Sequence, residues 1–554
     1  MVLVACAQPA PARPEAGAAG PASKPQRTLV VAVRGEPPSL AVKPLFAFSG
    51  GLNDPGSVFN ATLDFPDEQA VTRPYLAESL PQLNTETWRV FPDGAMETTY
   101  HLRPNLTWHD GAPLSAADFV FALEVYKNPE MGSAASVPIA QMEGASAPDA
   151  RTLVLRWRQA YPDAAELNRG FQALPRHLLE APYRDLDAAA FAALPFWTTA
   201  YIGLGPYRLE NWEPGAFMEG RAFDGHALGR PPIDRVKLSI IPDPQTALAG
   251  ILSGEVHYTG DFVFSQTEGQ TLEQRWAENH GGTVLYAPTE FRSTNVQVRP
   301  EVADPPELTD VRVRRALAYG IDSATAVEVL TAGRGLQTPT ITSPKVDFYP
   351  EIDRVIQRHP YDQRRVAQLL EEVGFVRGGD GFFARRDGQT VKLGVWSSAG
   401  TKNEQEAATY VDSLRRAGVD ASPNVITAAQ LGDRRLRALL PGLVLRGGGP
   451  GLDGLTSSAI AGPENRWTGD NRYGWSNGEY DRVFEAWAST LDQQERNSLT
   501  AQLERIISEE LPIIPNFFGV NVNAVVGPLQ GPVTRQTPGS GGPMLYIYTW
   551  SWRS

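Results

Sequence analysis

Short runs of β-branched and aliphatic residues recur along the chain, and stretches with helical periodicity separate them. The first run covers residues 28–33 and stops at Gly35 and a pair of prolines, as a buried strand does. One helical stretch begins after Ser115, which lies three residues before Asp118 in the spacing of a capping box, and another ends at Gly374. Alternating strands and helices predict a fold of the α/β class. Further strands are expected at 152–155, 236–241, 391–395 and 443–445, and further helices at 410–417 and 499–507.

Composition excludes several classes of protein. The chain has 554 residues, enough for several domains at roughly 150 residues each. It carries 50 basic and 63 acidic residues, a net charge of −13, and lacks the clustered Lys and Arg that nucleic-acid binding requires. Apolar stretches are interrupted within a few residues, so no segment is expected to span a bilayer. Cys6 is the only cysteine, which rules out disulfides and thiolate metal sites within one chain.

The first 27 residues are expected to form no part of the folded core. Residues 3–6 are a small-residue run ending in Cys6, typical of a bacterial lipoprotein signal, and Cys6 is therefore the predicted site of lipidation. Residues 7–27 are rich in Ala, Pro and Gly and predict a semi-extended tether. A lipidated cysteine on such a tether would hold the folded body beside a membrane. The alternative is an unstructured tail that contains a cysteine by chance.

One segment matches an enzyme motif. Residues 474–478 fit the G-x-S-x-G pattern of the hydrolase nucleophile elbow, which would make Ser476 a catalytic nucleophile. That motif requires a buried strand before it, whereas the preceding residues read as a polar turn. We therefore expect Ser476 or Asn477 to cap the helix that follows, and a secreted hydrolase is kept as a rival hypothesis. His109 and Asp110 should point to opposite sides of an extended chain, which makes them a poor catalytic pair.

Five segments in order along the chain carry a more specific signal. The strongest, residues 100–120, contains Leu102-Arg103, Trp108, Asp110-Gly111 and Asp118. These segments resemble the extracellular solute-binding proteins of family 5, which are the oligopeptide-, dipeptide- and nickel-binding components of ABC importers. The similarity runs from about Leu29 to about Pro532. The other four segments are 203–215, 251–256, 310–322 and 476–481.

This resemblance implies an α/β protein with the two-lobed periplasmic-binding-protein fold, of type II and the large peptide-binding subclass. Family members are binding proteins, not enzymes, and their lobes close over the solute by bending at a hinge. The implied division of the chain is a tether at 1–27, a first lobe at 28–65, 196–290 and 515–554, an inserted subdomain at 66–195, and a second lobe at 291–514.

The resemblance also implies partners and a location. The expected partners are a peptide or other small-molecule ligand and the permease subunits of an ABC transporter. A lipid anchor is the only expected contact with the membrane, and we expect a monomer in the cell envelope, periplasmic or extracytoplasmic. No cofactor, metal or nucleic acid is expected. A receptor that has lost its transport role is a further hypothesis.

Residues 446–453 depart from the pattern of the family's peptide binders. In those proteins a segment like G-W-x-x-D-x-x-D-P pairs its first aspartate with the amine of the peptide. Here Gly449 or Pro450 stands at that aspartate, while Asp453 survives at about the second acidic position. Arg446 would suit a ligand carboxylate or phosphate, because its guanidinium offers two parallel donors.

Trp396, at the end of an expected strand, and Trp467 and Trp475, in the loop region after Asp453, could supply a stacking surface for sugars or apolar side chains. Such residues pack in protein cores more often than they touch a ligand. The sequence therefore predicts capture of a peptide or peptide-like solute, with an oligosaccharide as the alternative and a metal complex as the weakest candidate, because no His, Cys or carboxylate cluster has ligand spacing. The predicted ligand-binding residues are Trp396, Arg446, Asp453, Trp467 and Trp475.

Overall fold

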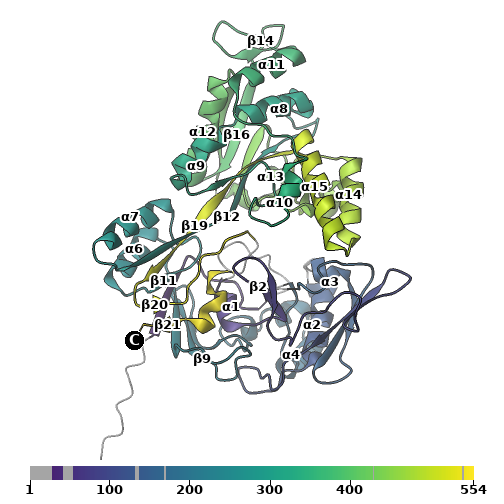
Figure 1. Ribbon diagram of the computed structural model, residues 1–554, viewed down its shortest axis with the longest axis vertical. Helices are drawn as coiled ribbons and strands as arrows, with labels where there is room; N and C mark the ends of the chain where they lie inside the picture. The colour runs from purple at the N-terminus through teal and green to yellow at the C-terminus, as the bar shows by residue number, and fades with distance from the viewer. Residues whose placement is uncertain are drawn as a thin grey trace, which may run out of the picture.

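In the part of the chain that the structure describes, a mixed sheet of eleven strands runs through both halves of the molecule. The computed structural model describes residues 28–41, 54–131, 137–167, 170–427, 429–538 and 542–553. The strand order is β17-β16-β18-β12-β19-β11-β1-β10-β9-β8, with β13 (Leu336–Gln337) paired to β19. The two longest strands, β12 (Gly282–Val296) and β19 (Ile513–Val526), pair antiparallel and pass from one body of the molecule into the other (Figure 1).

The lower lobe, the body at the bottom of Figure 1, consists of the described residues before about 286 and after about 519. A separate sheet in it has the order β4-β5-β7-β6, and α2 (Ala116–Lys127) packs on β6 and β7. Trp157 of this sheet and Tyr207 of the large sheet belong to one hydrophobic core. The strands of this lobe are β1 (Thr28–Val33), β4 (Trp88–Val90), β5 (Met96–His101), β6 (Met142–Ser146), β7 (Thr152–Trp157), β8 (Tyr207–Glu213), β9 (Phe217–Ala222), β10 (Arg235–Ile240) and β11 (Tyr258–Thr259).

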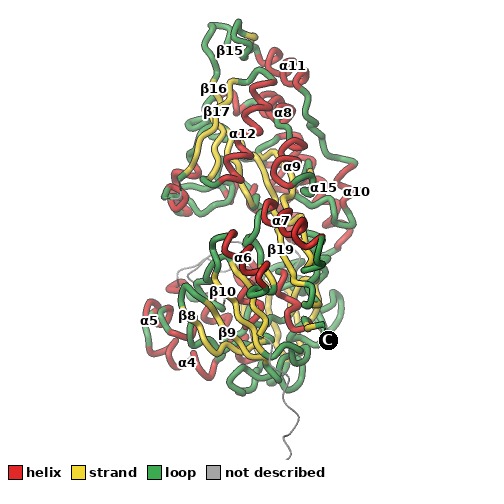
Figure 2. The backbone as a smooth tube through the Cα atoms, turned by 90° about the vertical axis from the view of Figure 1, so that its left-hand side faces the viewer, coloured by secondary structure: helices red, strands yellow, loops and turns green. Residues whose placement is uncertain are grey.

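The upper lobe, residues from about 290 to 518, has its own core around β16 (Lys392–Ser398), β17 (Asp420–Ile426) and β18 (Leu443–Gly447). Helices pack on both faces of these strands, as an α/β layer arrangement requires. Figure 2 shows the two lobes joined on one side, near α7 (Gln266–Ala277) and β19. The main helices of the upper lobe are α8 (Val311–Gly320), α9 (Ser323–Thr331), α11 (Gln363–Val373), α12 (Thr401–Arg416), α13 (Arg434–Ala438), α14 (Gly478–Ser489) and α15 (Gln493–Glu510).

The strands and helices expected from local patterns are present. The strands are β1, β7, β10, β16 and β18, and the helices are α2, α11, α12 and α15. Ser115 and Asp118 form the expected capping box of α2, and Gly374 ends α11 with φ of 106°. The boundaries expected between the two lobes, 290/291 and 514/515, fall within β12 and β19. Each of these two paired strands therefore continues from one lobe into the other. Cys6 and the tether lie outside the described residues.

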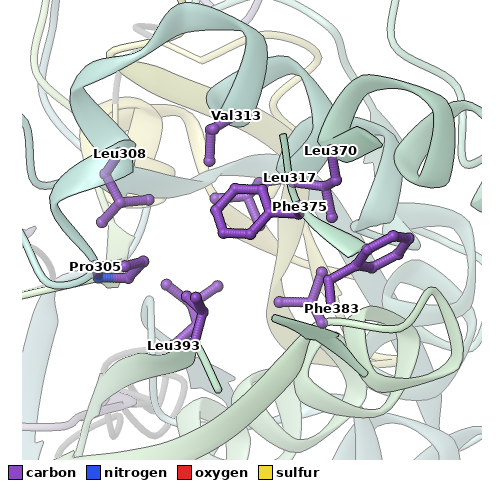
Figure 3. Close-up of a pocket in the computed structure, with 10 residues that line it drawn as sticks. Pro305, Leu308, Val313, Leu317, Leu370, Phe375, Phe383 and Leu393 are labelled. Carbon is purple, nitrogen blue, oxygen red and sulfur yellow. The ribbon is translucent and has the colours of Figure 1, made fainter. Parts of the chain in front are cut away.

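A small apolar cavity of about 30 Å³ lies inside the upper lobe (Figure 3). It is lined by side chains such as Leu317 of α8, Leu370 of α11 and Leu393 of β16. Leu393 lies near the amino end of β16, whereas the end that points toward the lower lobe is Ser398. The cavity therefore belongs to the core of the upper lobe and not to the region between the lobes. Among the described helices, none is long and apolar enough to cross a bilayer.

Candidate functional site

The strand directions of the two lobes point to the region between them. In the lower lobe β1, β10 and β11 run parallel to one another. β11 runs antiparallel to β19 and pairs with it at Val525, near the carboxyl end of β19. In the upper lobe β16, β17 and β18 are parallel, and β18 is antiparallel to β12. The carboxyl ends of both sets therefore face the opposite lobe. Because ligands of open α/β sheets bind outside the carboxyl ends of the strands, the interlobe region is the candidate binding site.

Arg446 lies one residue before the end of β18, where the upper lobe borders the interlobe region. Its side chain is only 11% exposed, and its Nη2 donates to Oδ1 of Asp470 at 2.8 Å. Arg472 approaches the same carboxylate oxygen at 3.4 Å. Burial, and next the charge of Arg446, lower the pKa of Arg472 to about 10. Arg446 is thus held in a basic environment at the strand end that faces the lower lobe.

The three predicted tryptophans lie in different environments. Trp396 of β16 is half-buried and packs in a small cluster with Val444 and Tyr473, on the same face of the sheet as Arg446. Trp467 is half-buried, and the Arg435 guanidinium lies 6.0 Å from the centre of its ring. Trp475 is 5% exposed and packs edge to face on Tyr480. It therefore belongs to a hydrophobic core cluster, the alternative to ligand contact for such a residue.

Asp453 lies in a short 3₁₀ turn (Asp453–Leu455) after the glycine-rich loop that follows β18. The residue is exposed, and its main-chain oxygen accepts hydrogen bonds from both the amide and the hydroxyl of Thr456. Its carboxylate is therefore accessible on the loop, and the turn fixes the main chain beside it.

Ser476 has no catalytic surroundings among the residues that the structure describes. Its exposed hydroxyl shares a hydrogen bond of 2.7 Å with Ser457. Asn477 is the N-cap of α14, and its Oδ1 accepts from the amides of Glu479 and Tyr480. The capping interpretation of this segment is confirmed.

His109 and Asp110 point to different partners, as expected for neighbours in an extended segment. His109 is buried and bonds the main chain at Gly203 and Gly205, whereas Asp110 accepts from His177 at 2.7 Å. Within the described residues, no three His, Cys, Asp or Glu side chains gather in an arrangement that could hold a metal ion.

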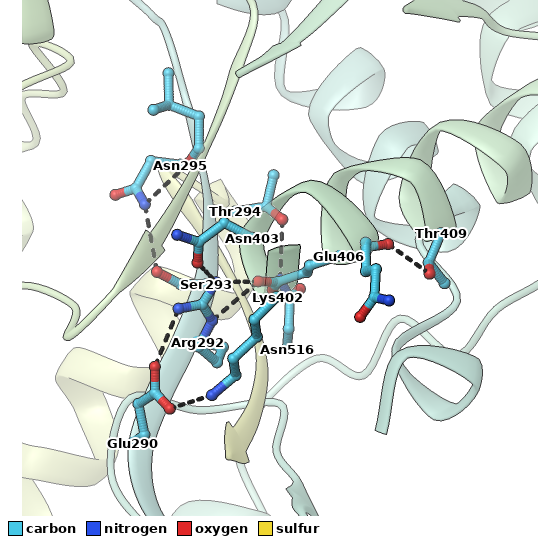
Figure 4. Close-up of polar contacts among 12 residues, drawn as sticks. Glu290, Arg292, Ser293, Thr294, Asn295, Lys402, Asn403, Glu406, Thr409 and Asn516 are labelled. Atoms are coloured by element: carbon cyan, nitrogen blue, oxygen red, sulfur yellow. Dashed lines mark hydrogen bonds and ion pairs between the residues drawn. The ribbon is translucent and has the colours of Figure 1, made fainter. Parts of the chain in front are cut away.

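A group of charged side chains lies where β12 leaves the lower lobe, and local sequence patterns gave no sign of it (Figure 4). Arg292 of β12 donates through Nε to Glu406 of α12 at 2.9 Å, and its Nη1 lies 3.1 Å from Glu290. Lys402 pairs with Glu290 as well, and Asn403 accepts from Arg292 at 2.8 Å. Burial works against ionisation of Glu290, but Lys402 and Arg292 outweigh it and hold its pKa below the ordinary value.

Among the described residues, two ion pairs connect the lobes directly. Arg496 of α15 makes a two-pronged contact with Asp163 of the lower lobe, with N–O distances of 2.5 and 3.0 Å. Arg334 of the upper lobe contacts Glu273 of α7 at 2.8 Å. The first contact is made by α15 and the second by α7, and these helices lie on opposite sides of β12 and β19 in Figure 1. These partners are too distant in sequence for a local pattern to reveal them.

Comparisons with known proteins agree with this architecture. The family model "Bacterial extracellular solute-binding proteins, family 5 Middle" matches residues 74–502. The oligopeptide-binding protein AppA of Bacillus subtilis is 24% identical over 529 residues, which are 92% of this chain and 90% of AppA. The AppA structure with a nonapeptide has a TM-score of 0.74 at 20% identity, covering 96% of this chain and 100% of AppA.

A second structural relative carries a different kind of ligand. NikZ of Campylobacter jejuni in complex with Ni(L-His) has a TM-score of 0.75 at 21% identity, covering 95% of this chain and all of NikZ. The similarity to both structures confirms the expected fold class. The two relatives share the fold but hold chemically different solutes. The fold therefore does not identify the solute of this chain, which depends on the residues of its own site.

Proposed function

Because this chain belongs to the bacterial extracellular solute-binding proteins of family 5, we propose that it captures a peptide or peptide-like solute between its lobes and delivers it to the permease of an ABC importer. Members of this family are non-catalytic binding components of transporters. The observation that carries the proposal is the meeting of two sets of strand carboxyl ends across the β12–β19 connection. The relative AppA, an oligopeptide-binding protein that is 24% identical over 92% of this chain and is solved with a nonapeptide, supports a peptide as the solute.

Several of the predicted residues suit this role in the structure. Arg446 and Asp453 flank the glycine-rich loop after β18 and offer charges of opposite sign to the two ends of a peptide. Trp396 and Trp467 are half-buried and retain ring surface that a side chain of the solute can contact. We propose a location in the cell envelope with Cys6 as the lipid anchor, on the basis of the family and of the residues around Cys6.

Solute addition should stabilise the protein against heat. A ligand present at a hundred times its Kd adds about 2.7 kcal/mol to stability. We expect the Tm of the purified full chain to rise by about 2–4 °C with mixed tri- to pentapeptides. Parallel samples receive oligosaccharides and the nickel–histidine complex. A rise with oligosaccharides alone would replace the peptide assignment by the alternative solute, and a rise with nickel–histidine alone would replace it by a metal complex.

The contact between Arg496 and Asp163 should favour the closed arrangement of the lobes. Removing the charge with Asp163→Asn takes away an ion pair that exists only when α15 lies against the lower lobe. For a pair worth about 1 kcal/mol, we expect peptide binding to weaken by up to about fivefold in titration calorimetry.

The matched control is Glu78→Gln, which removes a pair with Arg151 inside the lower lobe. This pair does not cross between the lobes, so the control should bind peptide like the wild type. Equal affinities of the Asp163 and Glu78 variants would show that the Arg496–Asp163 pair does not contribute to closure.

A further inference from the structure

The β12–β19 strand pair changes its register in the stretch that leads from one lobe into the other. Pro288 lies opposite Val520, whereas Glu290 lies opposite Gly519, so Thr289 is an extra residue on β12. A bulge of this kind breaks the regular ladder of hydrogen bonds and bends the strand that carries it. Because each lobe continues directly from this stretch, the bulge is the point at which the strand pair can bend most easily.

One residue of the upper lobe is held close to this bulge. Arg334 follows the end of α9, where two left-handed residues, Ala332 with φ of 48° and Gly333 with φ of 75°, turn the chain sharply. The amide of Arg334 donates to the main-chain oxygen of Thr331 at 3.0 Å. The chain then enters β13, which pairs with Phe518 of β19. The main chain of Arg334 is therefore fixed on the upper-lobe side of the bulge.

The guanidinium of Arg334 contacts two groups on the lower-lobe side. Its central carbon lies 4.1 Å from the centre of the Tyr286 ring, and its Nη2 lies 2.8 and 3.1 Å from the two carboxylate oxygens of Glu273. Tyr286 lies opposite Val522, four residues along β19 from Phe518. Glu273 belongs to α7, which lies beside the strand pair and below α9 (Figure 1). Arg334 therefore spans the bulge and joins the two lobes across it.

Tyr286 is supported on its other side by α7. A side-chain carbon at Gly269 would come within 2.8 Å of the Tyr286 hydroxyl, so the helix lies directly against the ring. The face of the ring attracts the guanidinium, and Glu273 attracts the same group. The side chains of Arg334 and Glu273 are 35% and 38% exposed, so both attractions are moderate and can restrain an angle without locking it.

We propose that Arg334 is a brace across the hinge, which limits how far the β12–β19 strand pair bends when no solute is bound. The brace concerns the range of lobe positions, so it goes beyond the proposed function and holds for any class of solute. The two interlobe contacts then have different roles. The pair of Arg496 and Asp163 joins the lobes on the α15 side, whereas Arg334 restrains the bend itself. Without the brace, the lobes should separate more widely and over a broader range.

The first test measures the distance between the lobes in the solute-free full chain. Two exposed residues, Glu86 of the lower lobe and Glu485 of α14, are replaced by cysteine for spin labelling, and Cys6 is replaced by serine. Pulsed electron paramagnetic resonance then gives the distribution of distances between the two labels. We expect Arg334→Ala to widen this distribution and to extend it to longer distances.

The matched control is Arg358→Ala, which removes an exposed arginine that pairs with Asp353 inside the upper lobe. Its distance distribution should equal that of the labelled parent protein. Glu273→Gln leaves the ring contact of Arg334 in place and should widen the distribution less than Arg334→Ala does. Equal distributions for Arg334→Ala and the parent, or the same widening in Arg358→Ala, would overturn the brace.

Hydrogen exchange determines whether the effect is confined to the hinge. In Arg334→Ala we expect the amides of residues 519–522 to exchange about three- to tenfold faster, because local opening there becomes easier, while those of β16 exchange as before. Faster exchange in both regions would indicate a general loss of stability and refute the brace. Neither measurement uses a solute, so a protein that binds no peptide can still show the brace. Measured peptide binding with an unchanged hinge would remove the brace alone.

Discussion

Lowering the pH from 7 to 5 should destabilise the lower lobe through two buried histidines. His109 and His226 are 2% and 5% exposed, and burial lowers the pKa of each from 6.5 to about 4. The unfolded chain therefore binds more protons than the folded chain between these values, so stability is complete above pH 6.5 and falls as the pH approaches 4. Each histidine should remove about 2 kcal/mol of the free energy of unfolding at pH 5.

The hydrogen bonds of His109 should make its side chain harder to protonate than that of His226. Its Nδ1 accepts from the amide of Gly203, a donor that cannot turn around, and its Nε2 donates to the carbonyl of Gly205. A proton on Nδ1 would break the first bond. His226 is more tolerant, because the hydroxyl of Tyr75 at its Nε2 can rotate from donor to acceptor.

Urea unfolding at pH 5, 6 and 7 tests this expectation with the His109→Asn variant. The amide oxygen of asparagine can still accept from Gly203 but does not titrate, so the variant should be less stable at pH 7 and should lose less stability on acidification. Carboxyl groups with raised pKa values, such as Glu504, act in the opposite direction but are common to both proteins. Parallel pH profiles of the two proteins would contradict the assignment to His109.

Local patterns predicted the elements whose chemistry is contained in a few neighbouring residues. Asn477 could be assigned to a helix start, because an N-cap acts on amides two and three residues ahead. The capping box at Ser115 and the glycine stop at Gly374 have the same local character. In each case the physical interaction has the same range as the sequence pattern.

The two strands that connect the lobes were not predicted, although they organise the whole molecule. All positions of β19 are buried, so the strand lacks the alternation that marks a half-exposed strand, and Pro515 interrupts its run of strand-forming residues. β12 contains Pro288 and a register shift just after it. Their pairing is a tertiary arrangement between segments far apart in the chain.

The candidate site was predicted only in part for the same reason. Arg446 and Asp453 lie in one segment that could be compared with a family pattern. The structure places Arg446 near the carboxyl end of β18 and Asp453 in the short turn after the glycine-rich loop. Asp163 and Arg496 are 333 residues apart, and Arg292 and Glu406 are 114 apart. Nothing local distinguishes such charges from ordinary surface residues until the fold brings them together.

Arg292→Met should be among the most destabilising substitutions in the upper lobe. Glu406 is fully buried, and Arg292 is its only cationic partner among the described residues. Removal of one member of a buried pair costs about 3–5 kcal/mol, because the other charge is left uncompensated in the interior. The free energy of unfolding in urea should fall by that amount at pH 7. Lys402→Met provides a control, since Glu290 then keeps Arg292 and the side chain of Lys402 is already 38% exposed.

The double variant Arg292→Met, Glu406→Leu separates the cost of an orphaned charge from the worth of the pair itself. Apolar replacement of both members of a buried pair is often neutral or stabilising, so we expect the double variant to recover most of the stability lost in Arg292→Met. A double variant as unstable as Arg292→Met would mean instead that Arg292 stabilises the fold through Glu290 and Asn403. The double variant could also recover its stability but bind the solute more weakly. In that case the buried pair serves to align β12 with α12 beside the hinge rather than to stabilise the upper lobe.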